Sequence, residues 1–527
     1  MSNNCYYSEF AKNIAASGIS YAFGVTGSGA SLQLITAIEK FNIPFYPVAH
    51  EAAAALMAGA CCRDGCARAI AIGIKGPGFI NFMPGILANY YEGRPALTIT
   101  EAYSPSDPAF KKHKRLDHFS VCSSVVKAYA RANTSLDSIH GLFNLAVTEF
   151  PGPIHIDMCN EPVEGKNVTC SIGEMSTEFS QSKVGEILTL IRGSSRPVVI
   201  LGSAMSRVSC GLNWEELAVP VVTTAAAKGC IDEFSPYASG VFTGEGKEIS
   251  PEEMVIKKSD LIVAFALRNV EVTRVKEFNI PTVMLDVIDG DMQDGFAASL
   301  SVTAKDLKHI AEPVFADLLK KEWGLESVQE YWKSVNTELP ESQWLPSVMF
   351  RALERAGLKD PLLVLDTGLF CIIGEILWRA RRPRNFCGSS NGRFMGTAIP
   401  TAIGAAISSP MQDVICVAGD GGVRPYFPEI RLAVELNLPL IFILMSDGQY
   451  GTVASSVKDH SLPNNAFTIK SPSWRHVVEA MGCSSVKVDD LNEFEDILSQ
   501  WSVQRRPLFI EASFEAEKYI SMVKRLR

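Results

Sequence analysis

The sequence predicts an α/β protein made of three doubly wound parallel-sheet domains. Short runs of apolar and β-branched residues recur throughout the 527 residues, and each is followed by a turn and then by a helical pattern. These runs are continuous and do not alternate with polar residues, which is typical of strands buried on both faces of a parallel sheet. Strands that alternate with helices define the α/β class with right-handed crossovers.

The predicted strands fall into three groups along the chain. The first group is Tyr21–Val25, Phe45–Val48, Ala69–Ile74, Ala96–Thr100 and Pro153–Met158. The second group is Pro197–Leu201, Pro220–Thr224, Leu261–Leu267 and Pro281–Val287. The third group is Pro361–Asp366, Val414–Ala418, Pro439–Met445 and Pro507–Ala512. Ligands of such sheets bind at the carboxyl ends of the strands, so the search for a site begins in the turns that follow them.

Two polar stretches without a strand pattern separate these groups. They are residues 160–182 and residues 322–346. We therefore predict domains over residues 1–165, 180–320 and 345–527, each about the size of one doubly wound sheet.

The composition limits the partners. Apolar residues make up 47% and charged residues 20%, as in ordinary globular proteins, and the net charge is −9. An acidic chain is not expected to take nucleic acid or an anionic membrane as its main partner, and no apolar run reaches the ~18 residues of a membrane span. The N-terminus lacks the features of a signal peptide, and 13 cysteines in a chain of this length indicate reduced thiols, so we expect a cytoplasmic protein.

Three of the cysteines lie close together in the first group. Cys61, Cys62 and Cys66 have no second ligand pair at the spacing of a zinc site, and an apolar helical run precedes them. We expect them to be packing residues.

The strongest chemical signal lies in the third group. The strand Val414–Ala418 runs into Gly419-Asp420-Gly421-Gly422, and the next strand runs into Ser446-Asp447-Gly448-Gln449-Tyr450-Gly451. The glycines allow backbone N–H groups to approach an anion. Asp420 and Asp447 follow consecutive strands, 27 positions apart. Together with phosphate oxygens and water, these two carboxylates would complete an octahedral shell for Mg²⁺.

These motifs resemble those of the thiamine-diphosphate-dependent enzymes of the acetolactate synthase and 2-oxo-acid decarboxylase family, a group that includes benzoylformate decarboxylase. The resemblance rests on Gly419-Asp420-Gly421 with its second polar turn, on Asn437-Leu438-Pro439 and on the segment from Gly392 to Ala405, and it runs over the whole chain. It implies pyrimidine-binding, central and diphosphate-binding domains, in that order. Asp447 departs from the asparagine usual in the family, but a carboxylate is a competent and harder metal ligand.

The resemblance also assigns the residues around the cofactor. Asp420 and Asp447 would bind the metal through their side chains and Gln449 through its carbonyl, and the glycines and Tyr450 of both motifs would surround the diphosphate. Met395 would hold the two cofactor rings in their bent shape. The carbonyl of Arg393 would accept the cofactor's 4′-amino group, and Gly76 and Gly368 would lie in the turns that contact it.

Activation of thiamine requires a buried carboxylic acid that shares a proton with the aminopyrimidine ring. Glu51 is the candidate, because it follows the strand Phe45–Val48 and opens an alanine-rich helix. A glutamate in the first turn of a helix is also favoured by the helix dipole alone. The family pattern of His50-Glu51 followed by Gly76-Pro77-Gly78 supports the catalytic role. In the family, this acid meets the diphosphate domain across a subunit interface, so a homodimer or homotetramer is implied.

The substrate pocket differs from that of simple decarboxylases. Those enzymes carry an Asp and a Glu that protonate the bound intermediate, where this chain has Ser28 and Val453. Without this relay the acyl anion should live long enough to attack a second carbonyl. The resemblance therefore favours a carboligase that decarboxylates a pyruvate-like 2-oxo acid and transfers the acyl group to a carbonyl acceptor. We include Ser28 and His113 among the candidate catalytic residues, and we expect His113→Ala to lower turnover more than cofactor affinity.

Several alternatives remain open. The glutamine of acetolactate synthases is absent from His113-Lys114-Arg115-Leu116-Asp117, so a non-ligating decarboxylase or a C–C lyase or hydrolase is also compatible. The basic run Lys111–Arg115 with His118 is best explained as a solvated loop. The alternative is that His113 or His118 reaches the active site as a proton shuttle or a carboxylate anchor. Arg268 aligns with an arginine near the substrate carboxylate or is a surface residue. Gly27-Ser28-Gly29 weakly suggests a Rossmann oxidoreductase. A non-catalytic paralogue is disfavoured, because Glu51, Asp420 and the segment around Met395 are all present. The central domain is expected to be Rossmann-like, and in some relatives this domain binds FAD.

Overall fold

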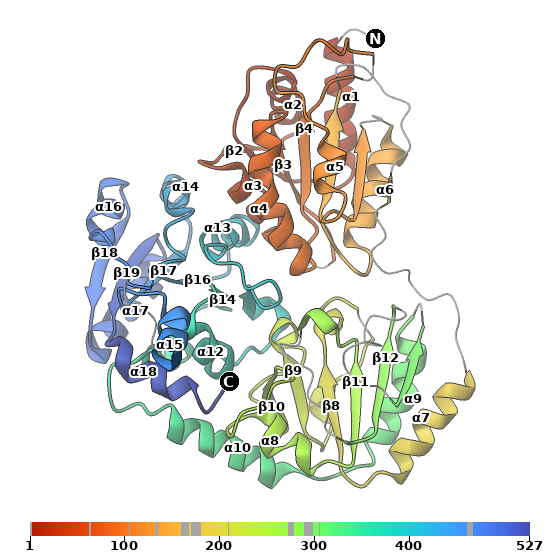
Figure 1. Cartoon of the computed structure of the whole chain (residues 1–527), viewed down its shortest axis with the longest axis vertical. Coiled ribbons are helices and arrows are strands. Elements are labelled where there is room, and N and C mark those ends of the chain that lie inside the picture. The colour runs from red at the N-terminus through yellow and green to blue at the C-terminus, as the bar shows by residue number, and fades with distance from the viewer. Residues whose placement is uncertain are drawn as a thin grey trace.

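The computed structural model describes residues 3–62, 65–104, 106–131, 135–159, 168–169, 181–208, 210–271, 279–288, 299–304, 306–460 and 467–527. Its strands form three separate sheets, each flanked by helices (Figure 1). This architecture confirms the predicted α/β class with three parallel-sheet domains. The predicted domain bounds stay predictions.

The first sheet contains seven strands. They are β1 (Tyr21–Gly24), β2 (Phe45–Pro47), β3 (Ala69–Gly73), β4 (Leu97–Glu101), β5 (Ala128–Arg131), β6 (Ile154–Met158) and β7 (Val168–Thr169). The helices are α1 (Asn3–Ala16), α2 (Ala30–Glu39), α3 (Glu51–Ala60), α4 (Pro77–Tyr91), α5 (His118–Cys122) and α6 (Leu136–Val147). All strand pairs of this sheet are parallel except that β7 runs antiparallel to β5, which differs from the all-parallel prediction.

The second sheet has six parallel strands. They are β8 (Pro197–Leu201), β9 (Val221–Thr224), β10 (Ala238–Phe242), β11 (Leu261–Phe265), β12 (Thr282–Asp286) and β13 (Leu300–Thr303). The helices of this part are α7 (Gln181–Gly193), α8 (Pro251–Met254) and α9 (Lys308–Leu318), and α10 (Leu325–Glu338) leads to the third sheet. The strand order β10-β9-β8-β11-β12-β13 is that of a dinucleotide-binding Rossmann sheet.

The third sheet also has six parallel strands. They are β14 (Leu362–Leu365), β15 (Phe386–Gly388), β16 (Val414–Gly419), β17 (Leu440–Ser446), β18 (Ser484–Val488) and β19 (Leu508–Ser513). Its helices are α11 (Pro346–Arg355), α12 (Leu369–Leu377), α13 (Ala398–Ser408), α14 (Ile430–Glu435), α15 (Gly451–His460), α16 (Trp474–Ala480), α17 (Leu491–Gln504) and α18 (Ala516–Val523).

The first and third sheets share one topology. Their orders are β2-β1-β3-β4-β6-β5 and β15-β14-β16-β17-β19-β18, which become identical when the strands of each sheet are numbered from its start. In such a sheet the order reverses between the first and third strands, and the crevice at the carboxyl ends of those two strands is the place where ligands bind. The crevices to examine therefore lie after β1 and β3, and after β14 and β16.

The first and third sheets are joined by close helix packing. The alanine-rich helix α3 lies between α4 and α13, and the three helices share one hydrophobic core (Figure 1). A side chain at Gly404 of α13 would lie 2.5 Å from the carbonyl oxygen of Met57, and one at Gly85 of α4 would lie 2.4 Å from that of Ala52. Small residues on all three helices thus allow their backbones to approach closely, which explains the run of alanines physically.

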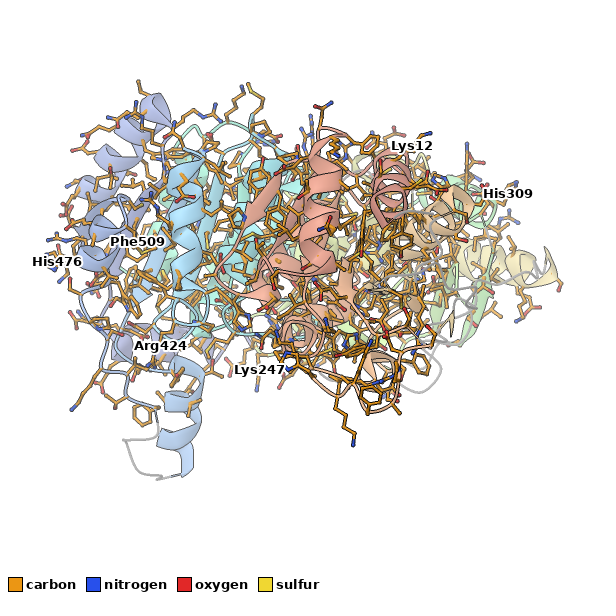
Figure 2. The ribbon with its side chains drawn as sticks, turned by 90° about the horizontal axis from the view of Figure 1, so that it is seen from above. Lys12, Lys247, His309, Arg424, His476 and Phe509 are labelled. Atoms are coloured by element: carbon orange, nitrogen blue, oxygen red, sulfur yellow. The ribbon has the colours of Figure 1, made fainter. Side chains whose placement is uncertain are left out.

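The outer faces carry polar side chains. Phe509 of β19 is buried inside the third domain, whereas His309 on α9 and His476 on α16 project from the periphery (Figure 2). Among the residues that the structure describes, no helix is long and apolar enough to cross a membrane.

Candidate active site

The first crevice is built by three turns that follow β1, β3 and β4. Ser28 lies exposed in the turn between β1 and α2. Glu101, at the end of β4, accepts hydrogen bonds from the backbone N–H and the hydroxyl of Ser31, at 2.9 and 2.8 Å. It also forms an ion pair of 2.9 Å with Lys75, the residue before Gly76. One buried carboxylate therefore fixes the Ser28 turn against the Gly76 turn.

Glu51 is the first residue of α3 and is 6% exposed. The Nδ1 atom of His50 caps this helix by accepting the N–H of Ala52, at 3.1 Å. The Nδ2 group of Asn81, on α4, donates to Oε2 of Glu51 at 3.0 Å. A side chain at Gly78 would lie 3.3 Å from Oε1, so the turn that opens α4 rests directly against this carboxylate.

The predicted basic run forms a loop over the Gly76 turn. Gly76 has a φ of +67°, and a side chain there would lie 2.6 Å from the carbonyl oxygen of Lys114. The hydroxyl of Tyr103 donates to the carbonyl of His113 at 2.8 Å. The imidazole of His113 is exposed, so the structure brings the backbone of this residue to the crevice and leaves its side chain in solvent.

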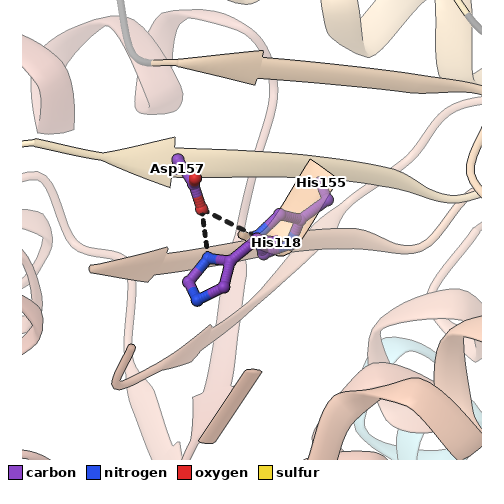
Figure 3. A group of neighbouring side chains, drawn as sticks. All are labelled: His118, His155 and Asp157. Carbon is purple, nitrogen blue, oxygen red and sulfur yellow. Dashed lines mark hydrogen bonds and ion pairs between the residues drawn. The ribbon is translucent and has the colours of Figure 1, made fainter. Parts of the chain in front are cut away.

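A buried polar network lies behind the Gly76 turn, and no sequence pattern links its members. His118, His155 and Asp157 meet in the interior of the first domain (Figure 3). Oδ1 of Asp157 lies 2.6 Å from Nδ1 of His118 and 3.1 Å from Nε2 of His155. Burial alone would raise the pKa of Asp157, but the hydrogen bonds from both imidazoles hold it well below its usual range.

The second crevice lies at the ends of β14, β16 and β17. Asp420 is 1% exposed, and its Oδ2 atom accepts the backbone N–H groups of Asp447 and Gly448 at 2.8 and 2.9 Å. Oδ1 of Asp420 accepts the hydroxyl of Ser471 at 3.0 Å. The N–H of Gln449 donates to Oδ1 of Asp447 at 3.1 Å. The predicted pair of turns is thus one connected unit.

The predicted glycines of this crevice make room for their neighbours. A side chain at Gly421 would lie 2.4 Å from the ring of Tyr450 and 2.8 Å from the sulfur of Met395. Gly368 precedes α12, and a side chain at Gly419 would lie 2.9 Å from the ring of Phe370.

Gly422 and Gly451 are equally confined. A side chain added at Gly422 would lie 2.3 Å from Oδ2 of Asp366, and one added at Gly451 would lie 3.3 Å from Cβ of Leu369. The thioether of Met395 is 43% exposed even though it lies among these residues, and Val453 is 44% exposed. Both side chains are large and apolar, and both are left open to a ligand or a partner.

Arg393 is held in a left-handed conformation by buried charge. Its φ is +49°, which is uncommon for a residue with a side chain. Its guanidinium donates to Oε1 of Glu375 at 2.5 Å, and Arg527 donates to Oε2 of the same carboxylate at 2.6 Å. Burial would raise the pKa of Glu375, but the two guanidinium groups hold it below its usual range.

Two carboxylates of the third domain were missed by sequence reasoning. Asp366 follows β14 and accepts the N–H groups of Thr367 and Gly396, and burial raises its pKa to about 7. Glu429 accepts the N–H groups of Ala49 and His50, immediately before Glu51, and burial raises its pKa to about 7. The position of Asp366 directly after a strand could have identified it as a site residue. The contact of Glu429 joins residues 380 positions apart, and no local sequence pattern indicates it.

The Rossmann-like crevice of the central domain is filled by its own side chains. Glu271 accepts the N–H and hydroxyl of Ser203, both at 2.8 Å, after β8. Arg268 is fully buried and paired with Asp286 and Glu149, so the interpretation of Arg268 as a surface residue is wrong.

The packing prediction for the three neighbouring cysteines is confirmed only for Cys61, because Cys62 is partly exposed and Cys66 is exposed. Cys61 is buried and its thiol donates to the carbonyl of Gly404 at 3.3 Å. None of the three neighbouring cysteines belongs to a group of potential metal ligands within the described residues.

The two crevices fit the two ends of thiamine diphosphate. The first presents a buried carboxylate beside an amide donor, and the second presents two carboxylates, backbone N–H groups and a glycine cradle. Family models agree with this division. The thiamine pyrophosphate enzyme N-terminal TPP binding domain matches residues 8–119, and the C-terminal TPP binding domain matches residues 366–512. The chain belongs to the thiamine pyrophosphate (thiamine diphosphate) enzymes.

Several acetolactate synthases are similar to this chain over nearly the full length of both proteins. A probable acetolactate synthase large subunit of Methanococcus aeolicus is 23% identical over 97% of this chain and 92% of its own length. A catabolic acetolactate synthase of Raoultella terrigena is 25% identical over 92% of this chain and 90% of its own length. The large subunit of acetolactate synthase isozyme 3 of Escherichia coli is 21% identical over 97% of this chain and 94% of its own length. This thiamine enzyme is therefore similar to acetolactate synthases along its whole length.

Proposed function

We propose that this thiamine-dependent enzyme decarboxylates a pyruvate-like 2-oxo acid and transfers the acyl group to a carbonyl acceptor. Two features together support the proposal. Glu51 is buried and accepts a hydrogen bond from the Asn81 side chain, and the chain has Ser28 and Val453 at the positions where simple decarboxylases have acids. Neither Ser28 nor Val453 can protonate an intermediate as a carboxylic acid does. The names of the relatives support the same reaction.

Glu51 is the group that activates the cofactor in this proposal. When bound, thiamine diphosphate supplies the acidic C–H group whose deprotonation starts the reaction. Glu51 holds a proton at its carboxyl for the aminopyrimidine ring, and Asn81 orients that carboxyl through its hydrogen bond at 3.0 Å. The turn at Gly78 lies beside the other carboxyl oxygen, Oε1.

Asp420 and Asp447 are the proposed side-chain ligands of Mg²⁺, with the carbonyl of Gln449 as a third ligand. Carboxylate and carbonyl oxygens are the ligands that Mg²⁺ prefers, and substrate phosphates and water complete its shell. The glycine cradle from Gly419 to Gly422 would receive the diphosphate, with Tyr450 and Gly451 beside it. Arg393 and Met395 would contact the aminopyrimidine and the two rings, and Gly76 and Gly368 would line the turns around them.

The central domain is proposed to work without FAD. Glu271 takes the N–H group of Ser203 at the switch point of the sheet, where the phosphates of a dinucleotide would accept such a bond. Glu271 therefore occupies the position that a phosphate of FAD would need. The purified protein should therefore be colourless.

Location and assembly complete the proposal. The twelve described cysteines are all free thiols, which fits a cytoplasmic protein. We propose a homodimer or homotetramer, because Glu51 and Asp420 lie in different domains that relatives combine across subunits.

The test is incubation of the protein with thiamine diphosphate, Mg²⁺ and a panel of 2-oxo acids, with and without aldehyde or ketone acceptors. The proposal predicts release of carbon dioxide together with a coupled 2-hydroxy ketone or 2-hydroxy-2-alkyl-3-oxo acid. Release of carbon dioxide and free aldehyde under all conditions would contradict it and favour the non-ligating decarboxylase. C–C cleavage without carbon dioxide would favour a lyase or hydrolase.

A further inference from the structure

The turn that rests on Glu51 is itself held by a buried imidazole. The backbone N–H of Gly76 donates to Nε2 of His118 at 3.2 Å. Gly76 precedes the first turn of α4 and has a φ of +67°, so this N–H has no carbonyl partner within the helix. Two residues later, Gly78 lies against the Glu51 carboxylate. His118 is therefore connected to Glu51 by the backbone of the turn from Gly76 to Gly78.

The bond from Gly76 fixes the proton of the imidazole. Because an N–H group can only donate, Nε2 of His118 must be the unprotonated acceptor, and the ring proton lies on Nδ1. That proton faces Oδ1 of Asp157 at 2.6 Å (Figure 3). Asp157 is in turn bound by His155, by the hydroxyl of Tyr129 at 2.5 Å and by Thr100 at 3.5 Å. Asp157 thus selects the one neutral form of His118 that can hold Gly76.

The network is buried, and its polar atoms bind one another. Phe79 stacks on the ring of His118 with centroids 4.0 Å apart and contacts the ring of His155 at 4.6 Å. His118 and His155 are 2% and 0% exposed. The three candidate ligand atoms of His118, His155 and Asp157 lie within 4.8 Å of one another. Since each already has a hydrogen-bond partner inside the domain, we interpret the group as a hydrogen-bond network and not as a metal centre.

We propose that His118 is a positioning residue for cofactor activation. Held by Asp157, it fixes the Gly76–Gly78 turn and with it the carboxylate of Glu51. This inference rests on the role proposed for Glu51 and names the element that keeps that acid in place. The carbonyl of Lys114, in the loop before α5, packs on the same Gly76.

The test compares two buried histidines of one network. His118→Phe keeps a ring against Phe79 but removes the acceptor for Gly76, whereas His155→Phe damages the same network without touching Gly76. The readout is hydrogen–deuterium exchange at the reactive carbon of thiamine diphosphate bound to the Mg²⁺-loaded protein. We expect His118→Phe to slow exchange by about tenfold or more, as a misplaced acid should, and His155→Phe to slow it by less than about threefold. Cofactor affinity should fall by less than the exchange rate in His118→Phe and should stay near the wild-type value in His155→Phe.

A second pair of variants covers the case in which the phenylalanine variants do not fold. His118→Gln places an oxygen near the position of Nε2 and can accept the N–H of Gly76, whereas the shorter His118→Asn cannot reach it. Exchange should be at least about fivefold faster in the glutamine variant. Equal rates in this pair would overturn the proposal, as would wild-type exchange in His118→Phe or equal slowing in His155→Phe.

The controls separate this inference from the proposed function. If Glu51→Gln slows exchange and His118→Phe does not, the positioning role alone fails. If Glu51→Gln exchanges like the unaltered protein, the role of Glu51 and this inference fail together.

Discussion

Asp366 shows how strongly single carboxylates are constrained in the diphosphate crevice. Its side chain lies between the backbone of Gly396 and the position that a side chain at Gly422 would occupy. Burial raises its pKa to about 7, and the two N–H donors only partly offset that cost. The group therefore keeps a proton in the folded chain at pH values where it has lost it in the unfolded chain.

The consequence is a measurable dependence of stability on pH. Between about pH 4 and 7 the folded state binds the extra proton, so Asp366 makes the free energy of unfolding fall as pH rises, by at most about 1.4 kcal/mol per pH unit. Asp366→Asn has nearly the same shape and no charge, so it lacks this dependence. In denaturation of the cofactor-free protein, the stability of the wild type relative to the variant should decrease from pH 5 to pH 8. A difference that stays constant over this range would contradict the assignment.

At the scale of elements, the packing of α3 against α13 determines where Glu51 stands. Glu51 opens α3, and Glu429 binds the two backbone N–H groups that precede it. Gly404 of α13 permits the approach to Met57. Glu51 is therefore fixed from both sides, by the core of its own domain and by residues of the third domain.

Gly404→Ala should disturb this packing. The added methyl group would lie 2.5 Å from a backbone oxygen that cannot move alone, so the helices must separate. We expect a loss of about 1–3 kcal/mol in the free energy of unfolding. The matched control is Gly185→Ala in α7, where nothing lies within 4 Å. There the better helix propensity of alanine should add up to about 1 kcal/mol. Equal effects of both substitutions would show that the close approach of the helices does not matter.

At the scale of the whole molecule, the two crevices belong to different sheets of equal topology. Within the described part of the chain, no hydrogen bond or ion pair links Glu51 to Asp420. Met395, Val453, Ile80 and Phe110 are large apolar side chains that the isolated chain leaves 43%, 44%, 44% and 80% exposed. These observations favour a site completed by a second copy of the chain.

Complementation tests this arrangement. Glu51→Gln and Asp420→Asn should each abolish activity alone. In a re-associated mixture of the two variants, one of the two sites in every mixed dimer combines an intact Glu51 with an intact Asp420, so about a quarter of the wild-type activity should return. Separately purified variants that are never mixed serve as the baseline. A mixture that contains mixed dimers but has no activity would place both residues of a site in one chain.

The sequence predicted what depends on local pattern. Continuous apolar runs predicted most of the strands, and the glycine-rich turns predicted the residues that meet in the second crevice. Strand burial and turn geometry depend on neighbouring residues and are therefore visible in the sequence. Contacts between distant segments were not predictable in this way. Glu429 binds the start of α3 across 380 positions, and His118 meets Asp157 across 39 positions. Single-residue patterns contain no information on such pairs. The catalytic role of His113 stays a prediction.

The central claim is that Glu51 activates the cofactor from its buried place at the start of α3. The most direct measurement is hydrogen–deuterium exchange at the reactive carbon of thiamine diphosphate, bound with Mg²⁺ to the wild type and to Glu51→Gln. The account predicts that exchange in the variant slows by about 100-fold or more, in the range of general acid–base catalysis, while the cofactor still binds. Exchange in the variant at the wild-type rate would contradict the account.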